Sequence, residues 1–261
     1  MSSLVGGLST TGFRSLLRRE ILRFVRRPRN TFLPPVITNV LYFSVFGVIL
    51  GSRLSGVSGD FGYVEFVLPG LVVLGIVSNA FENASFSIFH GRWNEYIHET
   101  LTSPLSYTSM VLAYVLSSAL RGLLVGILIY AVGYLFAPVV PARPFYLLAF
   151  AVVVPTLFAG LGVIGGLWAR DFDYLTVLTQ FILRPLVFFG GVFYSLSVLP
   201  EPFRTLSLLD PLVYMVDGVQ YGVLGYAELD PNLSLAVLTA LTLAVLLFDV
   251  YLFEKGYGLV D

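Results

Sequence analysis

The feature that most constrains the fold of this chain is a series of long apolar runs. Two of them, Tyr63–Phe89 and Ser109–Leu135, stand on either side of the polar stretch His90–Tyr107. A helix needs about 20 apolar residues to cross the hydrocarbon core of a membrane, and both runs are long enough. Charged residues make up only 12% of the chain, against about 25% in a typical soluble domain. These features predict an all-α membrane protein.

Six transmembrane helices are predicted, in a single domain that covers residues 1–261. The stretch 196–226 is apolar, but Pro200, Pro202 and Pro211 cut it into short pieces. Such pieces cannot cross a bilayer, and irregular backbone at membrane depth must be shielded by protein or line a cavity. We therefore expect short external re-entrant helices between spans five and six. The predicted spans are residues 36–50, 63–89, 109–135, 145–168, 175–194 and 233–253.

The distribution of basic residues predicts the orientation of the spans. With six spans, both ends of the chain lie on one side, together with His90–Tyr107. Outside the spans, that side carries ten arginine and lysine residues and the other side carries three. Basic loops remain in the cytoplasm. We therefore expect a multi-pass protein of the inner or plasma membrane, with both termini cytoplasmic and residues 196–226 external.

The N-terminal segment 13–29 has the pattern of an amphipathic helix. Its apolar residues recur at helical spacing and seven arginines fill most other positions, although Glu20 near the apolar face makes the pattern imperfect. We expect the apolar face to lie at the acyl chains and the arginines at the lipid headgroups. A bare topogenic signal, the alternative, would need no ordered apolar face. Asn30–Pro35 is expected to end the helix. The candidate interface residues are Arg18, Arg19, Arg23 and Arg26.

The polar stretch between the second and third spans is predicted to contain a helix of its own. Trp93, Tyr96, Ile97 and Leu101 recur at helical spacing, and Ser103-Pro104 would close the helix. A connector between spans needs only a few residues, so a helix here would be a handle on which a second protein could push. A solvated turn is the simpler alternative, and this stretch alone leaves both open.

No motif of catalysis is present in the sequence. The only lysine is Lys255, so the GxxxxGK[ST] phosphate loop is absent. The string GVSG around Ser58 matches an intramembrane serine protease motif, but the two histidines fall on the opposite side of the membrane, where neither can act as its base. His98-Glu99 begins a zinc motif that Thr102 breaks, and the chain has no cysteine. We expect no catalytic, metal or cofactor site.

Several polar residues fall where the predicted spans and the re-entrant stretch lie. Charged groups are costly in hydrocarbon unless they pair or face water, so each is a candidate for function or for helix packing. Glu82 and Arg121 belong to neighbouring spans and could pair. They could also form the ion relay of a self-contained secondary transporter or channel, although no convincing inverted repeat supports that alternative. The candidates are Asn79, Glu82, Arg121, Arg184, Pro185, Asp210, Pro211 and Asp217.

Taken together, these features resemble the ABC-2 type membrane permeases over nearly the whole chain. FVLPGLVVLGIVSNAF and the stretch GGVFYSLSVLP look like the YadH/NodJ-like branch of bacterial and archaeal exporters, and the C-terminal motif RPLVFFGGVFYSLSVLPEPFRTLSLLDPLVYMVDGVQYGVLG is the most specific part. One departure is Asp210-Pro211, where the family usually has Asn-Pro. The substitution preserves the turn but adds a charge.

The resemblance implies a transport subunit that is not itself an enzyme. Such permeases act as dimers, and each copy is docked to a separate cytoplasmic ATPase that binds ATP and Mg. By resemblance, residues 92–104 are the coupling helix, residues 13–29 contact the same ATPase, and Leu199–Gly225 cap the exit of the pathway. Related permeases move drugs, lipids or glycans, and no nucleic acid is involved. The residues this assigns to ATPase coupling are Arg92, Glu95, Tyr96, Glu99, Ser103 and Pro104.

Overall fold

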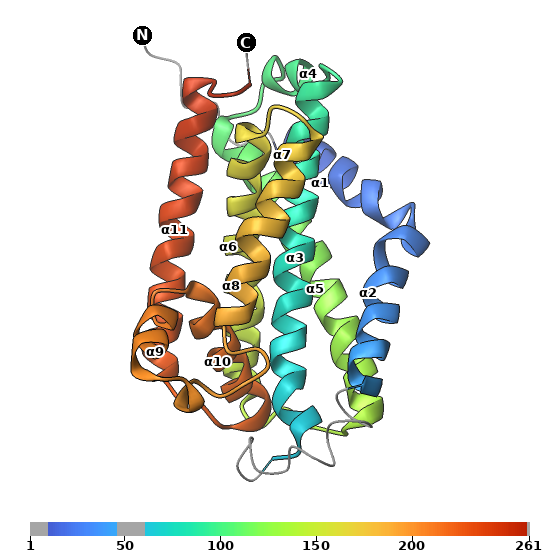
Figure 1. Cartoon of the computed structure of the whole chain (residues 1–261). Coiled ribbons are helices and arrows are strands. Elements are labelled where there is room, and N and C mark those ends of the chain that lie inside the picture. Colours follow the sequence, from blue (N-terminus) through green and yellow to red (C-terminus); the bar gives the residue numbers. More distant parts are fainter. Residues whose placement is uncertain (1–9, 46–60, 260–261) are drawn as a thin grey trace.

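A computed structural model describes residues 10–45 and 61–259, and the described part is helical, without a β-strand. The helices form an elongated bundle, with the short helix α4 at one end and α9 and α10 at the other (Figure 1). The helices are α1 (Thr10–Val25), α2 (Pro28–Phe43), α3 (Tyr63–Trp93), α4 (Ile97–Leu101), α5 (Tyr107–Phe136), α6 (Pro144–Trp168), α7 (Phe172–Val177), α8 (Arg184–Phe189), α9 (Glu201–Ser207), α10 (Pro211–Leu224) and α11 (Pro231–Lys255).

Four helices of the described part are long and apolar enough to cross a membrane, namely α3, α5, α6 and α11. They lie where the second, third, fourth and sixth spans were predicted. The all-helical membrane fold is therefore confirmed. Two further predicted spans fall on α2 and on the segment from α7 to α8. Neither is selected by helix length and hydropathy.

Helix α3 is the centre of the bundle, packed against both α5 and α6. The contact with α6 depends on small residues. A Cβ added at Gly162 would lie 2.5 Å from the carbonyl oxygen of Phe81, and one at Gly166 would lie 2.6 Å from that of Ser85. Glycine therefore lets the two backbones approach closely, as small residues commonly do between membrane helices.

The bend after the N-terminal helix does not lie at Asn30–Pro35, where it was predicted. Helix α1 ends at Val25, and Pro34 and Pro35 lie inside α2. Pro28 accounts for the shift, because a proline in the first turn of a helix loses no hydrogen bond and its φ angle suits a helix start. The end of the predicted first span and the GVSG string lie outside the described residues.

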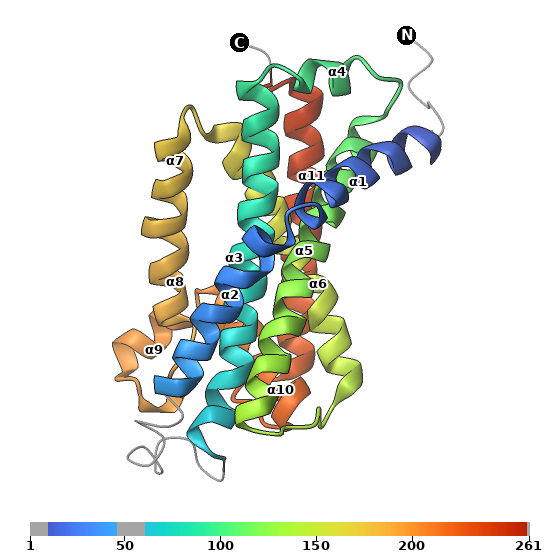
Figure 2. The ribbon, with the colours of Figure 1, turned by 90° about the vertical axis from the view of Figure 1, so that its right-hand side faces the viewer.

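The apolar face of α1 is also placed differently from the prediction. Leu16 and Phe24 are 6% and 3% exposed, because α1 packs on α5 and does not present this face to acyl chains. Figure 2 shows α1 lying across the bundle and continuing through the bend into α2.

The predicted fifth span is not a continuous α-helix. It consists of α7, a π-helical segment Leu178–Leu183 and α8, and it ends at Phe189 instead of residue 194. Pro185 has no N–H to donate to the carbonyl four residues earlier, which favours irregular helix geometry just before it. The side chain of Arg184 lies outside the described part of the chain.

Short helices follow, as the prolines of residues 196–226 predicted. A 3₁₀ turn Leu196–Val198 precedes α9 and α10. Asp210 caps α10, its Oδ1 accepting a hydrogen bond from the Leu212 N–H at 2.9 Å. An asparagine side chain offers the same acceptor, so the departure from the family's Asn-Pro preserves the cap.

Candidate functional site: a polar network beneath the connector

The connector between α3 and α5 is less helical than predicted. Helix α3 continues to Trp93, Glu95 turns the backbone with a φ of 61°, and only Ile97–Leu101 form α4. A residue in the left-handed conformation interrupts an α-helix, so the prediction of one amphipathic helix over residues 92–104 is wrong. Ile97 is 1% exposed and anchors α4, whereas Glu99 is exposed. The acidic side of the connector therefore faces outward.

Arg92 points into the protein and not toward a partner. Its Nη1 donates hydrogen bonds to the carbonyl oxygens of Gly166, Leu167 and Ala169 at 2.9, 2.9 and 2.8 Å. These are the last carbonyls of α6, where a cation is favoured by unpaired acceptors and by the helix dipole. Arg92 thus joins the ends of α3 and α6 at the base of the connector.

Two of the remaining connector candidates are exposed and one is held locally. Glu95 and Pro104 are exposed, and the hydroxyl of Ser103 donates a hydrogen bond to the carbonyl oxygen of Thr100 at 2.6 Å. The Ser103 hydroxyl therefore satisfies a carbonyl oxygen in the last turn of α4.

The centre of the site is Glu20 of α1, which is 3% exposed. Arg19 Nε donates a hydrogen bond to Glu20 Oε1 at 3.1 Å, Arg23 Nε lies 3.5 Å from Oε2, and the Ser87 hydroxyl of α3 donates to Oε2. A buried carboxylate is tolerated only when it is paired and hydrogen-bonded. Sequence reasoning missed this role, although an acidic residue near the apolar face of a basic helix was a signal for it.

Two arginines from different helices meet at Asn83 of α3. Arg23 Nη2 donates to the Asn83 carbonyl oxygen at 3.0 Å and to its Oδ1 at 3.2 Å. Arg121 of α5 donates to the same Oδ1 at 3.2 Å and to Asn79 Oδ1 at 3.3 Å. The Asn83 amide in turn donates to the hydroxyl of Ser118 at 2.9 Å. Asn79, Asn83 and Arg121 therefore tie α1, α3 and α5 together.

The predicted ion pair between Glu82 and Arg121 is not formed. Among the ion pairs between described residues, none joins these two side chains within 4.0 Å. Asn79 and Asn83 lie four residues apart on the α3 face that meets α5, whereas Glu82 projects about 100° away from Asn83 around the helix. Arg121 therefore reaches the asparagines.

Arg19 extends the network to the connector. Its Nη2 donates a hydrogen bond to the Tyr114 hydroxyl of α5 at 3.3 Å, and its guanidinium lies 5.6 Å from the ring centroid of Tyr96. Burial raises the pKa of the Tyr96 hydroxyl, and the charge of Glu20 raises it further, so Tyr96 is neutral at physiological pH. Of the predicted interface residues, Arg19 and Arg23 belong to this network, while Arg18 and Arg26 are exposed.

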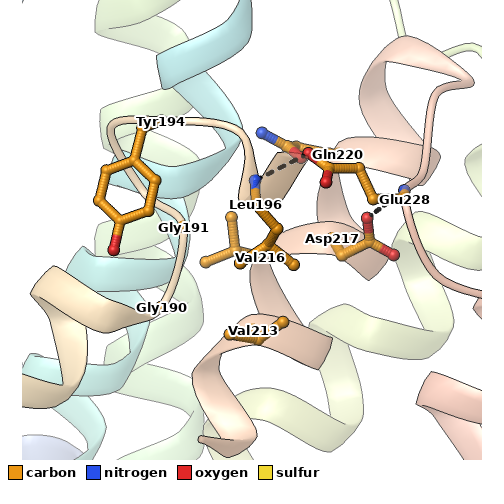
Figure 3. Close-up of a pocket in the computed structure, with 9 residues that line it drawn as sticks. All are labelled: Gly190, Gly191, Tyr194, Leu196, Val213, Val216, Asp217, Gln220 and Glu228. Carbon is orange, nitrogen blue, oxygen red and sulfur yellow. Dashed lines mark hydrogen bonds between the residues drawn. The ribbon is translucent and has the colours of Figure 1, made fainter. Parts of the chain in front are cut away.

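A second polar cluster (Figure 3) lies at α10, at the end of the bundle opposite to α4 (Figure 1). Asp217 of α10 accepts hydrogen bonds from the backbone N–H groups of Glu228 and Leu229 at 2.6 and 3.2 Å, and Glu228 accepts those of Leu196 and Ser197, both at 3.1 Å. Burial raises the pKa of Asp217 to about 6. These carboxylates hold three segments together around a small pocket, so the contacts of Asp217 are structural.

Comparison with known proteins places the chain in a family. Residues 11–224 match the family described as ABC-2 type transporter. The chain is 36% identical over 246 residues to the inner membrane transport permease YadH of Escherichia coli (strain K12), covering 94% of this chain and 96% of the relative. It is 23% identical over 238 residues to nodulation protein J of Rhizobium leguminosarum bv. viciae, covering 89% of each. The chain is therefore a membrane permease of the ABC-2 type transporter family.

Proposed function

We propose that the chain is the membrane-spanning subunit of an exporter that a separate ATPase drives. Six spans cross the membrane, with α2 as the first and the segment from α7 to α8 as the fifth. The segment from residue 196 to 226 is external and re-entrant, and both termini are cytoplasmic. Two copies, of this chain or of this chain and a paralogue, enclose the pathway.

One observation carries the proposal, namely that the network of Arg19 joins the connector to the core. The chain has no phosphate-loop motif of its own, so the ATPase of this proposal is a separate chain. Tyr96 in the connector contacts Arg19 of α1, and the neighbouring Glu20 is bound by Ser87 of α3. A force on α4 or α1 therefore reaches α3, which is the centre of the bundle.

The relatives support the placement of the chain, and the cargo is proposed from the family resemblance alone. One is named an inner membrane transport permease, which supports the inner membrane as the location of this chain. The cargo that suits such a subunit is an amphiphile, a drug, a lipid or a glycan. ATP and Mg belong to the ATPase and not to this chain.

The test is to purify the tagged chain with its associated proteins in a mild detergent, reconstitute the complex in liposomes and measure ATP hydrolysis and export. Glu99→Arg reverses the charge on the outer side of α4, so we expect ATPase binding and export to fall at least about tenfold, which corresponds to about 1.4 kcal/mol. Glu201→Arg, an exposed reversal in the segment proposed to lie outside, is the matched control for ATPase binding. Arg92 is a poorer test position because its contacts are internal.

A soluble partner with a phosphate loop, sensitive to Glu99→Arg and not to Glu201→Arg, supports the proposal. The proposal fails if the purified chain moves solutes on an ion gradient with no nucleotide, which is the behaviour of a secondary transporter. In that case the proposed ion relay could not use a direct ion pair between Glu82 and Arg121, since Arg121 is bound by asparagines.

A further inference from the structure

Three arginines at the bend between α1 and α2 have no acidic partner in the described part of the chain. Arg26, Arg27 and Arg29 lie within four residues, and all three side chains are exposed. The ion pairs of α1 are made by other residues, and Glu20, the acidic residue nearest in sequence, is buried and already bound within them. The positive charge of the bend is therefore available to a ligand outside the protein.

An open groove starts at Arg29, the last of these arginines, and follows the outer face of α2. Leu33 and Ile37 are 52% and 51% exposed, so its apolar floor is uncovered. Pro34 has no N–H to donate to the carbonyl of Asn30, which leaves that acceptor without its helical donor at the basic end. The groove therefore combines positive charge at one end with an apolar floor beyond it. Its lining is Arg29, Asn30, Leu33, Pro34, Ile37 and Thr38.

We propose that this groove binds one anionic glycerophospholipid of the cytoplasmic leaflet. The phosphate lies against Arg26, Arg27 and Arg29, and one acyl chain follows Leu33 and Ile37. The guanidinium fork matches phosphate oxygens, and anionic lipids attract basic segments at the cytoplasmic surface. The order of the two ends fits the proposed topology, in which α2 enters the membrane from the cytoplasmic side. The inference rests on that topology, and it needs neither the ATPase nor transport.

A lipid fits this surface better than a soluble protein does. Charge and apolar surface lie in sequence along one helix face, with Arg29 at its start and Ile37 about two turns further on. A phospholipid carries its charge and its chains in the same order. An acidic partner protein would use the arginines but would leave Leu33 and Ile37 uncovered.

The experiment is native mass spectrometry of the purified full chain in detergent, mixed with equal amounts of phosphatidylglycerol and phosphatidylcholine of identical acyl chains. We expect phosphatidylglycerol to be retained at least about tenfold better, since the positive charge of the three arginines attracts an anionic headgroup and not a zwitterionic one. The triple variant Arg26→Gln/Arg27→Gln/Arg29→Gln should lose this preference. Arg14→Gln/Arg143→Gln/Arg170→Gln removes the same charge from exposed arginines elsewhere and should keep it.

Two further arms separate the parts of the site. Ile37→Trp, which fills the groove and leaves the charges, should reduce retention of the whole lipid. Free glycerol 3-phosphate, which carries the charge without acyl chains, should not displace phosphatidylglycerol at equal concentration.

Several results would overturn the inference. These are equal retention of the two lipids, equal losses in both triple variants, unchanged retention in Ile37→Trp, or displacement by glycerol 3-phosphate. Loss of a co-purifying protein in the first triple variant with lipid retention unchanged would make the arginines a protein interface. A working ATP-driven exporter that retains no phosphatidylglycerol would overturn only this inference and would leave the proposed function standing.

Discussion

At the scale of the residue, Glu20 has the most consequential position in the network. It supplies the negative charge around which Arg19 and Arg23 are arranged, and it accepts a hydrogen bond from Ser87 of another helix. Removing one partner of a buried pair leaves the remaining charge unpaired, which costs more than the pair itself contributes. The role of Glu20 thus depends on its negative charge together with its burial.

Glu20→Gln is therefore expected to destabilise the protein while preserving its shape. Because Arg19 and Arg23 are partly exposed, we expect a loss of about 1–3 kcal/mol, which lowers Tm by several degrees. Thermal unfolding of the detergent-purified protein measures this loss. Glu254→Gln, an exposed change near the end of α11, is the control. Equal Tm values for the two variants would show that the charge of Glu20 does not stabilise the protein.

At the scale of the element, the closeness of α3 and α6 determines how rigidly the core moves. Arg92 ties together the ends of α3 and α6 that lie next to the connector, and glycines of α6 let the backbones approach. In the proposed mechanism, α3 and α6 are therefore expected to move together. The π-helical segment Leu178–Leu183 breaks the regular helix between α7 and α8, so that segment lacks the continuity of α3.

Gly162→Ala tests the contact between these two helices. The added Cβ would lie 2.5 Å from the Phe81 carbonyl oxygen and 2.8 Å from the Ala84 Cβ. The helices have to separate, at a cost of about 1–3 kcal/mol, and we expect a lower Tm and a lower yield of folded protein. Gly62→Ala, whose Cβ meets only ordinary contacts with Glu65 at 3.6 Å and beyond, should behave as wild type. A Gly162→Ala protein as stable as Gly62→Ala would show that the contact is not tight.

At the scale of the whole molecule, the proposed topology places the two polar clusters on opposite sides of the membrane. The connector with α4 lies at one end of the bundle and α9 and α10 at the other. The network of Arg19 is then cytoplasmic, where an ATPase can reach it. The cluster of Asp217 lies outside, where it holds the external segments together.

The chain lacks cysteine, so single introduced cysteines can map this topology without background labelling of native thiols. Glu201→Cys should react with a membrane-impermeant maleimide in intact cells. Glu99→Cys and Lys255→Cys should react only after the membrane is opened. Labelling of Glu99→Cys from outside, or protection of Glu201→Cys in intact cells, would contradict the proposed topology.

The long spans were predictable from the sequence because a span is a local property. A run of about 20 apolar residues crosses a membrane as a helix, because only a helix pairs all its backbone groups within the segment, whatever the rest of the chain does. The predicted spans 63–89 and 145–168 accordingly agree with α3 and α6 to within a few residues. The bend at the N-terminal helix was misplaced because Pro34 and Pro35 were read as helix breakers, whereas Pro28 begins the new helix.

The sequence by itself determined the class of the protein, its apolar helices and the family to which it belongs. Only the tertiary structure decided which polar residues meet. Glu20 meets Ser87 across 67 positions and Arg23 meets Asn83 across 60, and no local pattern shows such pairs. Arg92 and Arg121 were candidates for coupling and for an ion pair, but each found other partners. The reason is physical, since the partner of a buried charge is whichever group the packed helices bring within reach.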